Sequence, residues 1–166
     1  MKRIIITFVA LIIGMSSRSL LAQNSNMVQG TIRINAGLGV FPGIGAGLSG
    51  EYVLLDDLGP GYLTVGVSSG VLLKDTDSAN ISFLGIAARS AYGLSLIDNL
   101  DTYVGLSLGL MRKDTAFDDD YHLLDNHFRG GVFLGAAYYL TDSLGAYAEL
   151  NSFACPTLTL GVSIKF

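Results

Sequence analysis

The stretch PTLTLGVSIKF (residues 156–166) alternates apolar residues with small or polar ones and stops on an aromatic residue. A period of two is typical of a β-strand with one apolar face, because successive side chains point to opposite faces. The same period recurs, with no sustained helical stripe, at 31–40, 43–55, 61–73, 81–93, 102–112, 127–140 and 144–153. The sequence therefore predicts eight strands.

Three of the connections between these segments are alike. They read LLDDLGPGY (54–62), LIDNLDTY (96–103) and LTDSLGAY (140–147). Asp57, Asp98 and Asp142 lie 41 and 44 residues apart, which is the length of two strands and two connections. The repeating unit is therefore a hairpin, and the chain is predicted to be a meander of hairpins in one domain.

The two faces of the predicted strands differ in charge. One face is apolar and uncharged throughout, and the other carries tyrosines, many glycines and six charged residues: Arg33, Glu51, Arg89, Arg129, Glu149 and Lys165. A soluble ligand-binding barrel would need a charged exterior, and this polar face has too few charges to supply one. A membrane barrel needs the reverse, an uncharged outer band around a polar interior. We therefore expect an all-β, eight-stranded antiparallel up-and-down transmembrane β-barrel whose lumen holds these six residues as a polar cluster.

The N-terminal residues read as an export signal. Lys2 and Arg3 precede an apolar stretch, and Ala22 offers a plausible cleavage point. We expect a signal peptide at 1–22 and a barrel at 23–166. Removing three cations with the leader changes the formal charge from −4 to −7, which disfavours nucleic acid as a partner. The single cysteine, Cys155, excludes a disulfide scaffold within the chain.

The connections at the two ends of the predicted barrel differ in length. The three similar turns fall at one end, near the apolar-face aromatics Tyr52, Tyr92, Tyr138 and Phe166, where an aromatic girdle is expected. The other end carries KDTDSAN (74–80) and the longest predicted loop, RKDTAFDDDYHLLDN (112–126). We expect the short turns to face the periplasm. The interaction candidates of the long loop, which would attract a divalent cation or an extracellular partner, are Asp118, Asp119, Asp120 and His122.

The leader, the eight amphipathic strands, the short turns at one end and the terminal GVSIKF together resemble the small eight-stranded outer-membrane barrels of the OmpA/OmpX type. The resemblance implies a location in the bacterial outer membrane, surrounded by its lipid. It also implies that the last strand, ending in Phe166, is the signal that the outer-membrane assembly machinery reads.

Three classes of function fit such a barrel. A structural or surface-interaction role needs only a filled interior and exposed loops, and eight strands leave a lumen just wide enough for side chains. A narrow pore would use the many inward glycines. A lipid-modifying enzyme would use His122 or His127 with nearby Asp residues, but no serine can be assigned as the nucleophile. The Asp118–120 run also lacks the spacing of a calcium loop. We expect the structural or surface role, with no enzymatic activity and no cofactor.

Overall fold

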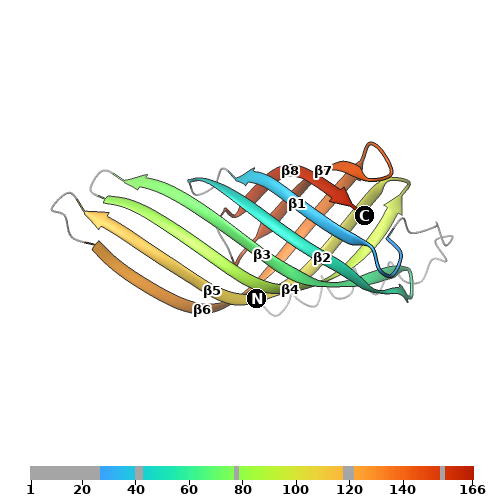
Figure 1. Cartoon of the computed structure of the whole chain (residues 1–166), viewed down its shortest axis with the longest axis horizontal. Coiled ribbons are helices and arrows are strands. Elements are labelled where there is room, and N and C mark those ends of the chain that lie inside the picture. The colour runs from blue at the N-terminus through green and yellow to red at the C-terminus, as the bar shows by residue number, and fades with distance from the viewer. Residues whose placement is uncertain (1–26, 40–42, 77–78, 118–121, 154–155) are drawn as a thin grey trace, which may run out of the picture.

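Eight antiparallel strands close into one barrel in the computed structural model (Figure 1). The structure describes residues 27–39, 43–76, 79–117, 122–153 and 156–166. The strands are β1 (Ile32–Gly39), β2 (Ile44–Leu58), β3 (Gly61–Thr76), β4 (Ala79–Ile97), β5 (Leu100–Phe117), β6 (His122–Tyr139), β7 (Leu144–Asn151) and β8 (Leu158–Lys165). Each pairs with its neighbours in sequence, and β1 pairs with β8. The predicted fold class and strand count are confirmed.

No helix among the described residues is long and apolar enough to cross a membrane.

Strand β1 closes the barrel by pairing with β2 on one side and with β8 on the other. Arg33 lies opposite Glu51 of β2 and opposite Lys165 of β8. The end of the chain joins this seam, because the Ile32 N–H donates to the Phe166 carbonyl at 3.1 Å and the Phe166 N–H donates back at 2.9 Å. Closing the sheet in this way removes the unpaired edges that an open sheet would have.

The outward and inward faces follow the predicted sorting. Outward side chains are large, apolar and exposed, as at Leu38 (68%), Leu106 (67%) and Leu110 (58%), whereas the alternate positions point inward and include buried polar and charged side chains. This inversion of the usual soluble arrangement is the pattern of a membrane barrel, in which lipid rather than water meets the apolar face.

The short connections β2–β3, β4–β5 and β6–β7 lie at one end of the barrel, here called the turn end, together with the first described residues and Phe166 (Figure 1). Two of these turns use a left-handed residue, Gly59 (φ 69°) and Asn99 (φ 67°), which are residue types that tolerate this conformation. The predicted girdle residues Tyr52, Tyr138 and Phe166 are exposed here. The Tyr92 hydroxyl donates to the Leu58 carbonyl at 3.0 Å.

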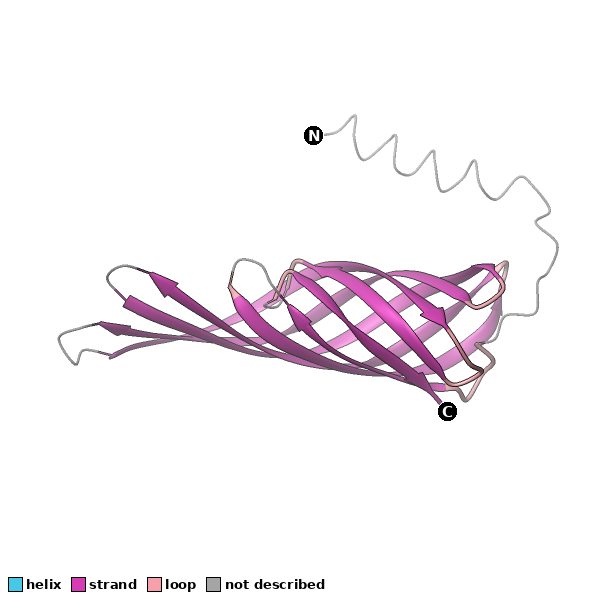
Figure 2. Cartoon of the chain, turned by 90° about the horizontal axis from the view of Figure 1, so that it is seen from above, coloured by secondary structure: helices cyan, strands magenta, loops and turns pink. Residues whose placement is uncertain are grey.

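The opposite end differs from the sequence-based expectation. The predicted loops 74–80 and 112–126 are wrong as loops, because β3 runs to Thr76, β4 starts at Ala79, β5 runs to Phe117 and β6 starts at His122. The two hairpins β3–β4 and β5–β6 therefore project beyond the other strands as a ribbon (Figures 1 and 2). Continuous cross-strand pairing, from Lys74 opposite Ile81 to Ala116 opposite His122, keeps these polar segments in strand conformation.

A short segment before β1 enters the turn end. Met27 is fully buried and packs with Val53 and Tyr62. Backbone hydrogen bonds hold the segment, from the Gly30 N–H to the Val53 carbonyl (3.1 Å) and from the Val53 N–H to the Thr31 carbonyl (2.9 Å). The apolar Met27 side chain therefore covers the lumen at this end, a feature that the sequence pattern did not indicate.

Candidate functional site

Four charged side chains meet inside the barrel and form what we call the lumen cluster: Arg33, Glu51, Arg89 and Glu149. Glu51 binds two cations, since its Oε2 lies 2.5 Å from Arg33 Nη2 and its Oε1 lies 2.8 Å from Arg89 Nε. Arg89 in turn makes a two-pronged contact with Glu149, with Nη2–Oε2 at 2.7 Å and Nη1–Oε1 at 3.2 Å. The four groups form one chain of alternating charge with no net charge.

Neutral side chains also donate hydrogen bonds to the two carboxylates. The Thr64 hydroxyl donates to Glu51 Oε2 at 2.9 Å, and the Tyr103 hydroxyl donates to Glu149 Oε2 at 3.1 Å. Both guanidinium groups also lie over aromatic rings, Arg33 Cζ 4.1 Å from the centre of the Tyr103 ring and Arg89 Cζ 3.7 Å from that of Phe133. Such stacking suits a guanidinium held away from water.

The lumen cluster connects most of the barrel wall. Arg33 comes from β1, Glu51 from β2, Arg89 from β4 and Glu149 from β7, and their neutral partners come from β3, β5 and β6. All four charged residues are at most 7% exposed. Separating the partners of a buried ion pair leaves uncompensated charges, which is costly. The lumen cluster therefore stabilises the closed arrangement of the strands that carry it.

Two of the six residues predicted for this cluster lie elsewhere. Lys165 is buried on the same inward face, but its Nζ lies over the Tyr139 ring at 4.0 Å. Arg129 is exposed, because β7 pairs with β6 only from Phe133 to Tyr139 and position 129 lies beyond the closed part of the barrel. Sequence alternation identified the correct face of β6 but could not show where β7 ends.

The inward glycines make room for large side chains from neighbouring strands. A methyl group at Gly135 would collide with the Tyr103 ring, one at Gly105 with Phe133, and one at Gly39 with Pro156. These aromatic and proline rings occupy the space that the glycines leave open. Tyr62 and Tyr103 are likewise buried parts of the interior.

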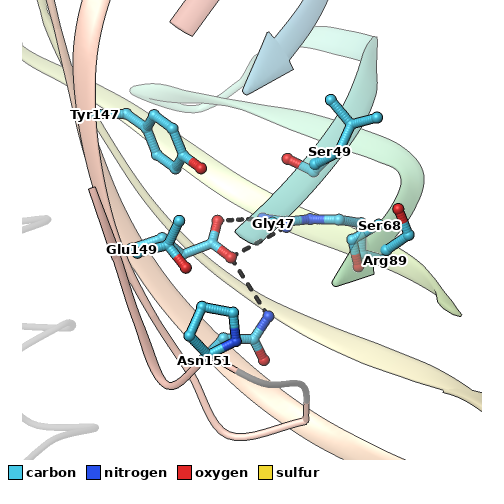
Figure 3. A pocket seen from close by; sticks show the side chains of 11 residues that line it. Gly47, Ser49, Ser68, Arg89, Tyr147, Glu149 and Asn151 are labelled. Carbon is cyan, nitrogen blue, oxygen red and sulfur yellow. Dashed lines mark hydrogen bonds and ion pairs between the residues drawn. The ribbon is translucent and has the colours of Figure 1, made fainter. Parts of the chain in front are cut away.

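A small cavity lies beside the Arg89–Glu149 pair (Figure 3). Its volume is about 30 Å³, and its lining includes Gly47, Ser49, Ser68 and Asn151. Glu149 connects this cavity to the lumen cluster, since its Oε1 also accepts a hydrogen bond from Asn151 Nδ2 at 3.4 Å.

The projecting ribbon brings a second group of polar residues together. Lys113 lies opposite Asp125 across the β5–β6 pair, and Met111 lies opposite His127. The His127 Nε2 is 2.8 Å from Asp125 Oδ2, with both side chains about half exposed. Of the predicted interaction candidates, Asp118, Asp119 and Asp120 lie outside the described residues, and His122 is described only by its backbone at the start of β6.

One edge of the ribbon lacks a neighbouring strand over the residues that the structure describes. Before Phe133, strand β6 pairs with β5 on one side. On the other side it has no paired strand among the described residues, although Ser152 is hydrogen-bonded to Val132 and Phe153 lies against Gly131. The Ser152 N–H donates to the Val132 carbonyl at 2.9 Å, and the Val132 N–H donates to Ser152 Oγ at 2.8 Å. Because main-chain groups of alternate residues point the same way, Gly130, Phe128 and Asn126 also direct theirs to this edge.

No group of three or more His, Cys, Asp or Glu residues is placed to hold a metal ion within the described part of the chain.

No protein-family model matches the sequence, and no curated protein matches it. Solved structures do resemble the fold. Neisserial surface protein A (NspA) is 19% identical with a TM-score of 0.58, covering 82% of this chain and 94% of that one. The N-terminal β-barrel domain of Pseudomonas aeruginosa OprF is 20% identical with a TM-score of 0.55, covering 83% and 98%. Ail, the attachment invasion locus protein of Yersinia pestis, is 11% identical with a TM-score of 0.52, covering 84% and 100%. The chain therefore has the fold of the small eight-stranded outer-membrane β-barrels.

Proposed function

We propose that this protein is an integral protein of the bacterial outer membrane that anchors a surface-exposed sheet for interaction with other molecules. The observation that carries the proposal is the projecting β3–β6 ribbon with its open β6 edge. A barrel that served only to fill the membrane would need no strands beyond its closed part. An edge with free N–H and C=O groups is a template for pairing with another extended chain.

The chemistry of the edge describes the partner that would fit. An added strand would hydrogen-bond to the main chain of Asn126, Phe128 and Gly130. Phe128 is 69% exposed and would pack against an apolar side chain, while the exposed Arg129 would favour a carboxylate opposite it. The partner is therefore an extended peptide segment with mixed apolar and acidic side chains.

A proline at position 126 tests this mode of binding. Asn126→Pro removes an N–H that points to the open edge while leaving the β5 ladder bonds of its neighbours, and Asn126→Ala is the matched control. Peptides that bind the refolded protein would be selected from a displayed library of extended peptides. We expect the selected peptides to bind the native chain and Asn126→Ala but not Asn126→Pro; equal binding to all three proteins would reject edge pairing.

The orientation of the barrel and the acidic residues 118–120 belong to the same proposal. With the turn end in the periplasm, residues 118–121 lie outside the cell, where Asp118, Asp119 and Asp120 would attract divalent cations shared with lipid phosphates. Protease added to intact cells should cut an epitope inserted at 118–121 and spare one at 57–60. The reverse pattern would invert the topology and remove the surface assignment.

We propose further that the barrel neither conducts ions nor catalyses a reaction. The lumen cluster and the rings that fill the glycine spaces support a closed interior. The pair His127–Asp125 is solvated, and no nucleophile is hydrogen-bonded to His127 among the described residues. Planar-bilayer recording should give no steady single-channel conductance, and incubation with outer-membrane lipid should give no modified lipid.

Assembly follows from the last strand. We propose that the signal peptide at 1–22 directs export and that the strand ending in Phe166 is recognised by the outer-membrane assembly machinery. In the folded barrel, Phe166 is 73% exposed.

A further inference from the structure

The cavity beside the lumen cluster has many polar lining residues, next to the less polar Leu48, Tyr147 and Pro156. Its lining includes the hydroxyl-bearing residues Ser49, Ser68 and Thr159, together with Glu149 and Asn151 (Figure 3). It lies between β2, β3, β7 and β8, where Gly47 leaves the wall without a side chain. An apolar cavity of this size stays dry, whereas a polar one with several partners holds water.

One hydroxyl group in the lining of the cavity lacks a hydrogen-bond partner within the described part of the chain. The Ser68 hydroxyl is buried, and no hydrogen-bond partner for it is present among the described residues. A hydroxyl offers one donor and two acceptor sites, and leaving all of them unused in a buried position is costly. The other serine differs, since Ser49 Oγ accepts a hydrogen bond from Asn35 Nδ2 at 3.2 Å.

We propose that this cavity is a binding site for one or two structural water molecules that hydrogen-bond to Ser68 and to the polar groups around Glu149. The volume of about 30 Å³ is sufficient, since one water requires roughly 10–15 Å³. The bound water forms hydrogen bonds with Ser68 and hydrates one side of the Arg89–Glu149 pair. The lumen cluster therefore has one polar contact to water in addition to its contacts with protein side chains.

Gly47→Ala distinguishes a hydrated cavity from a dry one by the sign of its effect. The nearest atoms to an added methyl group are those of the Thr159 side chain at 3.7 Å, an ordinary contact, so the methyl enters the cavity without a clash. In a hydrated cavity it displaces water and leaves Ser68 unsatisfied, and the folding equilibrium constant should fall about tenfold. In a dry cavity the methyl fills a void and the constant rises.

Gly50→Ala is the control on the same strand, because a methyl group there meets nothing within 4 Å. Ser68→Ala is a second variant whose effect on stability has opposite signs in a hydrated and in a dry cavity. It removes a water partner if the site is hydrated and should lower stability, whereas in a dry cavity it removes a buried unsatisfied hydroxyl and should raise stability.

A high-resolution crystal structure of the native protein gives the direct readout. We expect ordered water within hydrogen-bonding distance of Ser68 Oγ, and its loss or displacement in Gly47→Ala. A cavity without ordered water, combined with greater stability of Gly47→Ala and Ser68→Ala than of the native protein, overturns the proposal.

Discussion

Glu51→Gln is the most informative single change in the lumen cluster. Glu51 is 2% exposed and bridges Arg33 and Arg89 at 2.5 and 2.8 Å. The substitution keeps the shape of the side chain but leaves two guanidinium groups with one carboxylate, Glu149, so a neutral buried cluster gains a net charge of about +1. Breaking a buried pair in this way costs about 3–5 kcal/mol of unfolding free energy.

The magnitude can be measured by urea unfolding of the protein refolded in lipid vesicles. The chain contains no Trp, so far-UV circular dichroism and the gel mobility of unheated samples are suitable probes. Asp57→Asn, which removes an exposed carboxylate at the turn end, is the matched control. The double variant Glu51→Gln, Arg33→Met restores charge balance and should recover part of the loss. A Glu51→Gln protein as stable as Asp57→Asn would refute the argument and indicate a freely hydrated lumen.

Three further predictions concern packing and assembly. Gly135→Ala should lower stability by about 1–3 kcal/mol relative to Gly50→Ala, because Tyr103 must move and lose its hydrogen bond to Glu149. Met27→Ala should lower stability by about 2 kcal/mol or more and speed hydrogen exchange of the Val53 amide, since it removes the buried cover of the turn end; unchanged exchange would count against that cover. Deleting Phe166 should reduce the amount of heat-modifiable protein in membranes, and an unchanged amount would argue against the assembly signal.

The barrel could be predicted because its strands obey one simple rule throughout. Every closed segment alternates apolar and polar or small residues, and the uncharged face is so complete that only lipid can be its environment. The similar connections at 54–62, 96–103 and 140–147 fixed the hairpin order. This information is local in sequence and needs no knowledge of how strands stagger.

Predicting the contacts of the interior and the extent of the projecting ribbon would have required the register between strands. Alternation placed Arg33, Glu51, Arg89 and Glu149 on one face, but only the register brings Arg89 of β4 to Glu149 of β7 and leaves Arg129 outside. The polar composition of 112–126 suggested a loop, although cross-strand pairing made most of it strand. The burial of Met27 depends on a contact with Val53 and Tyr62 that no sequence period reports.

Density-gradient fractionation of cells that express the full chain tests the central claim most directly. A closed barrel with an uncharged outer face around the lumen cluster requires a lipid environment. The protein should therefore sediment with outer membranes and, without heating, migrate on a denaturing gel as a compact species that shifts on boiling. Recovery of the protein mainly in the soluble periplasmic fraction would contradict this account.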